Sequence, residues 1–255
     1  NARDIRCPEP ISYQDLSRVH TAEYLESLGH ARVLAEMFAL DSSDLPVDEV
    51  MRTVRLGTGG TLDAARDSLR HHCSCANLLG GFHHAGPSRG GGFCVVNDIA
   101  VAVSVLRSEG FDGKISVLDF DAHPPDGTAE CFREDDTVWI GSISGSDWGR
   151  LDGVDETVLP AGSGDKLYLD TLEGLISRMP HASLVFVIAG GDVLSGDRMG
   201  GLGLSLEGAR KRDHRVAQAL LGISSVWLPG GGYHRDSWRV FAGAVLGLLT
   251  KKGGV

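Results

Sequence analysis

Four short apolar runs, each separated from the next by a stretch with helical spacing, constrain the fold of this chain more than any other feature. The runs cover residues 116–118, 137–140, 184–189 and 226–228. Continuously apolar strands that alternate with helices are typical of a parallel sheet covered by helices on both faces. We therefore predict an α/β fold of three layers, α/β/α, with a central, mainly parallel sheet.

Polar residues gather directly after each predicted strand. In open α/β sheets, ligands bind at the edge formed by the carboxyl ends of the strands. We therefore predict one site at that edge, built by loops that follow different strands. The polar clusters are His83 and His84, which follow a short predicted strand beginning at Asn77, and residues 119–126, 190–192 and 230–233.

The cluster at residues 119–126 combines three carboxylates with one imidazole. At the two-residue period of a strand, Asp119, Asp121 and His123 share one face. An unpaired carboxylate in a protein interior is costly, so we expect a positive partner there. Two oxygens and one nitrogen suit zinc and leave a fourth position open for water. The alternative is a solvated loop with scattered acidic residues.

The adjacent histidines, His83 and His84, have no packing reason to exist if they face solvent. Glycines on both sides permit close approach of the backbone to a ligand, which favours a functional role. The glycine-rich run at residues 90–92 is followed by no Lys-Ser/Thr pair, so we expect it to line a channel rather than to bind phosphate. Asn97 or Asp98 is placed to cap the helix that follows.

Amphipathic spacing predicts helices that cover the sheet between residues 13 and 40. Turn chemistry at residues 41–46 separates them from a second helical stretch around residues 62–69. We expect the glycines of residues 57–60 to open this second stretch. A single domain over residues 1–255 accounts for the whole pattern. The first residue is Asn rather than Met, so we expect part of the N-terminal edge to be missing.

Charge and composition narrow the classes of partner. With 24 Lys and Arg against 34 Asp and Glu, the formal net charge is 24 − 34 = −10, which works against direct binding of nucleic acid. No apolar run approaches the roughly 18 residues of a membrane span, and no signal sequence opens the chain. We expect a cytoplasmic protein without a membrane partner.

Five cysteines, an odd number without paired zinc-ribbon spacing, predict reduced thiols. Cys73 and Cys75 could hold a metal, but two nearby thiols more often have no such role. Cys94 would make activity sensitive to oxidation if its thiol were exposed and partly ionised.

Six motifs in order along the chain resemble those of the zinc-dependent histone deacetylase family. The bacterial relatives of this family include acetylpolyamine amidohydrolases and acetoin-utilisation proteins. The similarity runs from about Leu16 to the C-terminus and is closest in detail to bacterial and class IV-like members. The motifs are Gly81-Phe-His-His-Ala85, Gly92-Phe-Cys-Val-Val-Asn-Asp98, Leu118-Asp-Phe-Asp-Ala-His123 with Asp126-Gly127, Leu159-Pro-Ala-Gly-Ser-Gly-Asp165, Asp192-Val-Leu-Ser-Gly-Asp-Arg198 and Gly230-Gly-Gly-Tyr233.

The resemblance implies the arginase/deacetylase fold and a zinc ion held by Asp121, His123 and Asp192. It also implies a set of catalytic residues: an acid/base pair of histidines, the carboxylates that orient them, and a hydroxyl donor to the substrate carbonyl. The acid/base pair is His83 and His84, the orienting carboxylates are Asp119 and Asp126, and the hydroxyl donor is Tyr233.

Further residues are implied for substrate and for a second cation. Phe93, next to Gly92, would form one wall of a narrow acyl-lysine tunnel, Trp148 the opposite wall and Met199 part of its mouth, with Gly231 also at the substrate. The second cation, potassium, would be bound by backbone carbonyls around Asp119, Asp121, His123, Ser142 and Ile143.

Two departures from the family pattern leave the substrate open. Pro124 and Pro125 replace a frequent His-Gly pair and stiffen the link to Asp126. The loop at residues 144–148 is short, which would widen the rim of the site.

We therefore expect a zinc amidohydrolase that removes acetyl or longer acyl groups from lysine side chains or from small amines such as polyamines. One alternative is a non-catalytic module that binds acyl-lysine, although a pure reader has no use for a histidine pair beside a metal. The other is a ureohydrolase-like enzyme with two manganese ions. That enzyme would need more bridging carboxylates, and Asp119 and Asp126 keep it open.

Overall fold

The structure, a computed structural model, describes residues 5–42 and 45–250. Within these ranges the strands form one sheet in which every neighbouring pair is parallel. The strands are β1 (Ser74–Ala76), β2 (Ile115–Asp119), β3 (Val138–Ser144), β4 (Val154–Val158), β5 (Leu184–Ile188) and β6 (Ser224–Leu228), and their order across the sheet is β1-β6-β5-β2-β3-β4. The predicted three-layer α/β fold with a parallel sheet is confirmed.

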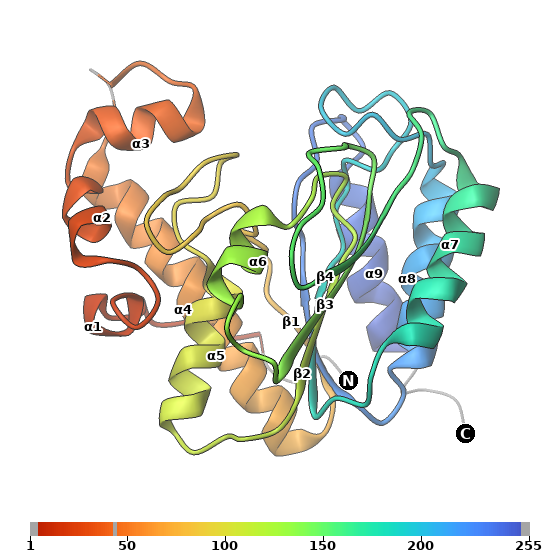
Figure 1. Cartoon of the computed structure of the whole chain (residues 1–255), viewed down its shortest axis with the longest axis horizontal. Coiled ribbons are helices and arrows are strands. Elements are labelled where there is room, and N and C mark those ends of the chain that lie inside the picture. The colour runs from red at the N-terminus through yellow and green to blue at the C-terminus, as the bar shows by residue number, and fades with distance from the viewer. Residues whose placement is uncertain (1–4, 43–44, 251–255) are drawn as a thin grey trace.

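Helices cover both faces of this sheet. Figure 1 shows α1 to α5 on one side and α7 to α9 on the other, with the strands between them. The helices are α1 (Tyr13–Leu16), α2 (Ala22–Ser27), α3 (Ala31–Phe38), α4 (Val47–His71), α5 (Asp98–Ser108), α6 (Asp126–Cys131), α7 (Asp165–Arg178), α8 (Leu206–Ala219) and α9 (Trp238–Thr250). In the described part of the chain, no helix is both long and apolar enough to cross a membrane.

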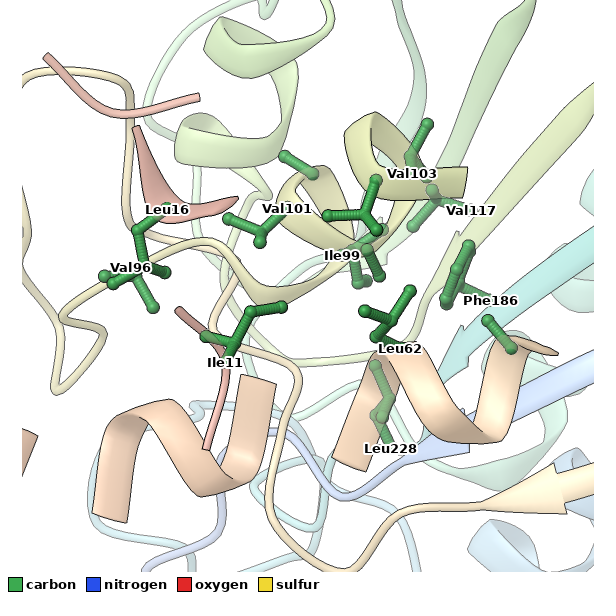
Figure 2. Close-up of a cluster of buried hydrophobic side chains, with 14 of the residues drawn as sticks. Ile11, Leu16, Leu62, Val96, Ile99, Val101, Val103, Val117, Phe186 and Leu228 are labelled. Carbon is green, nitrogen blue, oxygen red and sulfur yellow. The ribbon is translucent and has the colours of Figure 1, made fainter. Parts of the chain in front are cut away.

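Alternate residues of the central strands pack into two separate hydrophobic cores, one on each face of the sheet. Val117 of β2 and Phe186 of β5 pack against α4 and α5 on one face, in the cluster drawn in Figure 2. Leu118 and Val187 point to the other face and pack with residues of α7, α8 and α9. All residues of β2, β5 and β6 are buried, which explains why these strands read as continuous apolar runs.

The glycines at residues 57–60 do not open a helix, as the sequence predicted, but lie inside α4. This helix begins ten residues earlier, at Val47. A side chain at Gly59 would collide with the backbone of Glu9, and a Cβ atom at Gly60 would lie 2.7 Å from Asn77 Oδ1. These glycines therefore permit close packing around α4 and outweigh the local preference of glycine against helix.

Two further predictions about strands were wrong. No strand begins at Asn77; the strand in this region, β1, lies just before it and ends at Ala76. The Asn77 side chain donates to Gly57 O and Leu79 O and holds a turn instead. Strand β4 was missed altogether. It lies at the edge of the sheet and its residues are only partly buried, so its sequence lacks an apolar run. By contrast, the cap of α5 was predicted correctly: Asn97 Oδ1 accepts from Ala100 N.

Candidate active site

Asp121, His123 and Asp192 converge at the carboxyl ends of β2 and β5. The three offer ligand atoms that all lie within 4.8 Å of one another. His123 Nδ1 is 3.0 Å from Asp121 Oδ1 and 3.1 Å from Asp192 Oδ2. Asp121 and Asp192 are almost fully buried. Among the described residues this is the one cluster of three or more metal-type side chains.

The donor set fits a divalent cation. Burial and the neighbouring charge of Asp121 raise the pKa of Asp192 to about 7, as expected for two carboxylates packed side by side in a protein interior. A divalent ion between them would offset this repulsion. Two carboxylate oxygens and one imidazole nitrogen form a set that zinc commonly uses in sites that keep a position open.

Backbone contacts hold each of these three side chains in place. His123 Nε2 donates a hydrogen bond to Met199 O at 3.1 Å, so Nδ1 is the ring nitrogen that faces the two carboxylates and would be the one to bind a metal. Gly231 N donates to Asp121 Oδ2 (2.7 Å), and Ala122 N donates to Asp192 Oδ1 (3.0 Å). These backbone donors help to orient the carboxylate oxygens, and His83 Nε2 also lies 3.6 Å from Asp121 Oδ1.

Asp119 does not join this cluster, although the two-residue period placed it on the same face. Strand β2 ends at Asp119, so its regular alternation does not continue to Asp121. Asp119 Oδ2 instead lies 2.9 Å from His83 Nδ1, and Asp119 Oδ1 accepts from Asp121 N. Asp119 therefore lies against His83 rather than among the three metal-type side chains.

His83 and His84 form two adjacent histidine–carboxylate pairs beside the cluster. His84 Nδ1 is 2.6 Å from Asp126 Oδ1, and the two imidazole rings are 4.0 Å apart. Both histidines are buried, and both keep Nε2 turned away from the carboxylate that Nδ1 binds. Asp126 lies in the first turn of α6, directly after Pro125.

The two histidines differ in their affinity for a proton. Burial alone would lower the pKa of His83, but the charges of Asp119 and Asp121 outweigh it and raise the pKa to about 9. Burial and the neighbouring His83 lower the pKa of His84, and Asp126 opposes them only in part. One histidine that holds a proton beside one that lacks it is the arrangement that acid and base catalysis on one substrate requires.

Aromatic rings surround the cluster. The rings of Phe93 and Tyr233 are 5.5 Å apart, and Trp148 stacks on His84 at 5.3 Å with about half of its surface exposed. Burial, followed by the charges of Asp121 and Asp192, raises the pKa of Tyr233, so its phenol keeps its proton. These aromatic residues, which the sequence placed at the substrate, lie together in the structure.

Two glycines bring backbone against the polar groups. Gly92 adopts the left-handed region (φ 53°), and a Cβ atom there would collide with the His84 ring. A Cβ atom at Gly231 would lie 2.8 Å from Asp121 Oδ2 and 2.9 Å from Asp192 Oδ2. The exposed side chain of Met199 lies at the same rim. Every residue that the sequence assigned to the metal, the histidine pair or the aromatic walls is therefore brought to one place.

The chain as a whole matches a known protein family. The family model described as histone deacetylase domain matches residues 1–249. The chain belongs to the histone deacetylase family. Histone deacetylase 2 of Arabidopsis thaliana is 30% identical over 254 residues, which cover 93% of this chain and 65% of that protein.

Solved structures of the histone deacetylase family share the fold. A histone deacetylase homologue in complex with SAHA matches with a TM-score of 0.81 and 25% identity, over 97% of this chain and 73% of that one. Acetylpolyamine aminohydrolase from Burkholderia pseudomallei matches with a TM-score of 0.80 and 20% identity, over 97% of this chain and 85% of that one. The chain spans between 57% and 65% of the length of three curated relatives.

Ser142, which the family resemblance implied for a second cation, lies on β3 beside Asp119 of β2. Its hydroxyl is buried and has no hydrogen-bond partner among the described residues. Ser142 pairs with Asp119 across β2 and β3, and Ile143 follows it in the buried part of β3. An oxygen ligand that is buried without a partner is what a monovalent cation would satisfy.

Several residues that support the site were not predicted. Asp98 accepts from Gly81 N and Phe82 N and so fixes the loop before the histidines. Asp197 Oδ2 accepts from both Tyr233 N and His234 N at 2.7 Å. Both aspartates belong to motifs that the sequence singled out, so their importance could have been suspected. Their roles could not be predicted, because their backbone partners are distant in the chain.

The proposed sensitivity of Cys94 to oxidation does not agree with its surroundings. Its side chain is buried, and burial strongly raises the pKa of the thiol. A buried, protonated thiol is a small apolar group rather than a nucleophile.

Proposed function

We propose that this chain is a zinc-dependent amide hydrolase that removes acetyl or longer acyl groups from acylated lysine side chains or from small acylated amines such as polyamines. The observation that carries the proposal is the convergence of Asp121, His123 and Asp192 beside two histidines, each backed by its own carboxylate. A binding module would need the pocket but not paired groups for moving protons.

The metal would be held by Asp121, His123 and Asp192. When bound, zinc would lower the pKa of a water molecule to near neutrality and polarise the substrate carbonyl. Potassium would be held near Ser142 and Ile143, with Asp119, Asp121 and His123 contributing from β2 and the loop after it.

The histidine pair moves protons in this proposal. Nδ1 of each ring is fixed by Asp119 or Asp126, so Nε2 is the atom that takes a proton from the attacking water or gives one to the leaving amine. The Tyr233 hydroxyl donates to the carbonyl oxygen as negative charge develops there. Phe93 and Trp148 exclude water from the acyl chain, while Gly92, Met199 and Gly231 shape the rim.

The acyl group remains open to lengths beyond acetyl. A cavity of about 360 Å³ borders Phe93 and Phe82 and is lined mainly by apolar residues of α4 and its neighbours. This supports a test with a series of acyl lengths. The net charge of −10 works against nucleic acid as a substrate. The cytoplasmic location stays a prediction.

Hydrolysis of a panel of acyl-lysine peptides and acylpolyamines by the zinc-loaded chain tests the proposal. We expect turnover of at least one substrate, and we expect Asp192→Ala to lose both zinc and activity because a ligand is missing. Full zinc content in Asp192→Ala would remove that residue from the metal site. Tight binding of an acyl-lysine peptide without turnover would favour the non-catalytic module instead.

A further inference from the structure

Arg212 of α8 is fully buried directly behind the loops that carry the candidate metal ligands. Its Nη1 donates to two backbone carbonyls, Gly190 O at 2.9 Å and Phe120 O at 3.2 Å. Phe120 directly precedes Asp121, and Gly190 stands two residues before Asp192. One nitrogen atom therefore ties together the two chain segments that deliver ligands from the neighbouring strands β2 and β5.

These carbonyls lie where the sheet no longer holds the two segments together. The parallel register of β2 and β5 ends with Asp119 opposite Ile188, and the last bond of this ladder runs from Phe120 N to Ile188 O. Beyond it, the segments remain in contact: a Cβ atom at Gly190 would lie 2.7 Å from Asp121 Cα. Arg212 thus replaces the missing rungs of the ladder at the point where the ligands begin.

Charge does not explain the presence of Arg212. Asp213 Oδ1 accepts from Arg212 Nε at 2.8 Å, so the guanidinium has a counter-ion on its own helix. The surrounding cluster is apolar, with Val187 and Ala209 among its members, and an aliphatic side chain would pack there without any charge to bury. The planar fork of arginine is suited to holding backbone carbonyls at fixed positions.

We propose that Arg212 is a positioning residue that sets the separation of Asp121 and Asp192 and, through it, the affinity of the site for its metal ion. This inference rests on the proposed metal site. Groups that orient ligands from behind typically change metal affinity by about 10- to 100-fold when they are lost.

Arg107 offers a control at the opposite end of β2. Its Nη1 also donates to two backbone carbonyls, Phe111 O and Gly113 O, both at 2.8 Å, and its Nη2 donates to Thr137 Oγ1. These residues precede β2 and β3, whereas the ligands follow β2 and β5. Arg107→Met removes comparable bonds without touching the ligand loops.

The test compares two variants with this control. The double variant Arg212→Met with Asp213→Asn removes both charges together, so no buried charge is left alone. Arg212→Lys keeps the charge beside Asp213 and loses the planar fork. Zinc dissociation constants are measured by competition with a chelator, and thermal unfolding of the metal-free proteins reports general stability.

We expect the zinc dissociation constant of the double variant to be about 10- to 100-fold higher than that of the wild type, and that of Arg212→Lys to be intermediate. Arg107→Met should lower the unfolding temperature yet keep the affinity within threefold of wild type. An unchanged zinc affinity in both Arg212 variants would overturn the inference. Equal loss of affinity in Arg107→Met would also overturn it, because general loosening would then explain the effect.

Hydrogen exchange separates this inference from the proposed metal site. In the metal-free protein, we expect faster amide exchange at residues 119–123 and 190–192 in the Arg212 variants, and no change there in Arg107→Met. If wild-type protein bound no zinc, the metal site would be wrong, while these exchange rates would still test whether Arg212 holds the two segments in place. Unchanged exchange at both segments would overturn the proposed role of Arg212 itself.

Discussion

Tyr233 is the residue whose single hydroxyl separates catalysis from binding. Because its interaction with the carbonyl oxygen strengthens as charge develops, Tyr233→Phe should lower kcat by roughly 10²- to 10³-fold while leaving zinc content and KM close to wild type. Steady-state kinetics on an acyl-lysine substrate, with zinc measured by elemental analysis, checks this. Near wild-type kcat in the variant would remove the hydroxyl from the mechanism.

Tyr24→Phe is the matched control at this scale. Its hydroxyl donates to Val95 O at 2.5 Å and takes no part in the proposed site. The change should lower stability by about 1 kcal/mol, the net value of a typical hydrogen bond, with little effect on kcat.

Single residues also show how far the sequence could predict the site. Asp121, His123, the histidine pair and Tyr233 follow strands and belong to recognisable motifs, so the sequence was sufficient to single them out. Arg212 was not, because nothing in the amphipathic pattern of α8 distinguishes an arginine that faces solvent from one that reaches two distant carbonyls. Asp197 was missed for the same reason, since its partners are backbone atoms.

Among the structural elements, the loop that carries Gly92 packs closely against the His84 ring. Gly92→Ala introduces a Cβ atom into the His84 ring and forces an alanine to adopt positive φ. We expect kcat to fall roughly 10²-fold because the ring is displaced, while zinc content is retained. Gly91→Ala is the control, since a Cβ atom there has no neighbour within 4 Å. Similar losses in both variants would argue against a specific contact with His84.

Elements were predictable where burial set their pattern and not where long-range contacts did. Strands β2, β5 and β6 are buried on both faces and were read directly as apolar runs. The start of α4 was predicted wrongly because its glycines make room for Glu9 and Asn77, which are neighbours only in the folded chain.

For the whole molecule, the metal should add stability to a fold that two apolar cores already hold. With zinc at about 100 times its dissociation constant, binding adds about 2.7 kcal/mol. For a chain of this size, each kcal/mol shifts the unfolding temperature by about 2–4 °C, so removing zinc with a chelator should lower it by roughly 5–10 °C. Calorimetry with and without chelator checks this. Asp192→Ala should show no such shift, and a shift of equal size in that variant would place the zinc elsewhere.

The position of β1 next to β6 has a consequence for how the protein is made. Ser74 pairs with Ser225, so 225 − 74 = 151 residues must be added before the first strand meets its only neighbour in the sheet. At the usual pace of about 5–20 residues per second on a ribosome, that wait lasts roughly 8–30 s. His83 and His84 lie in the loop that follows β1, so we expect the histidine pair to reach its place only after β6 has been synthesised. Activity in nascent chains would therefore report the pairing of β1 with β6.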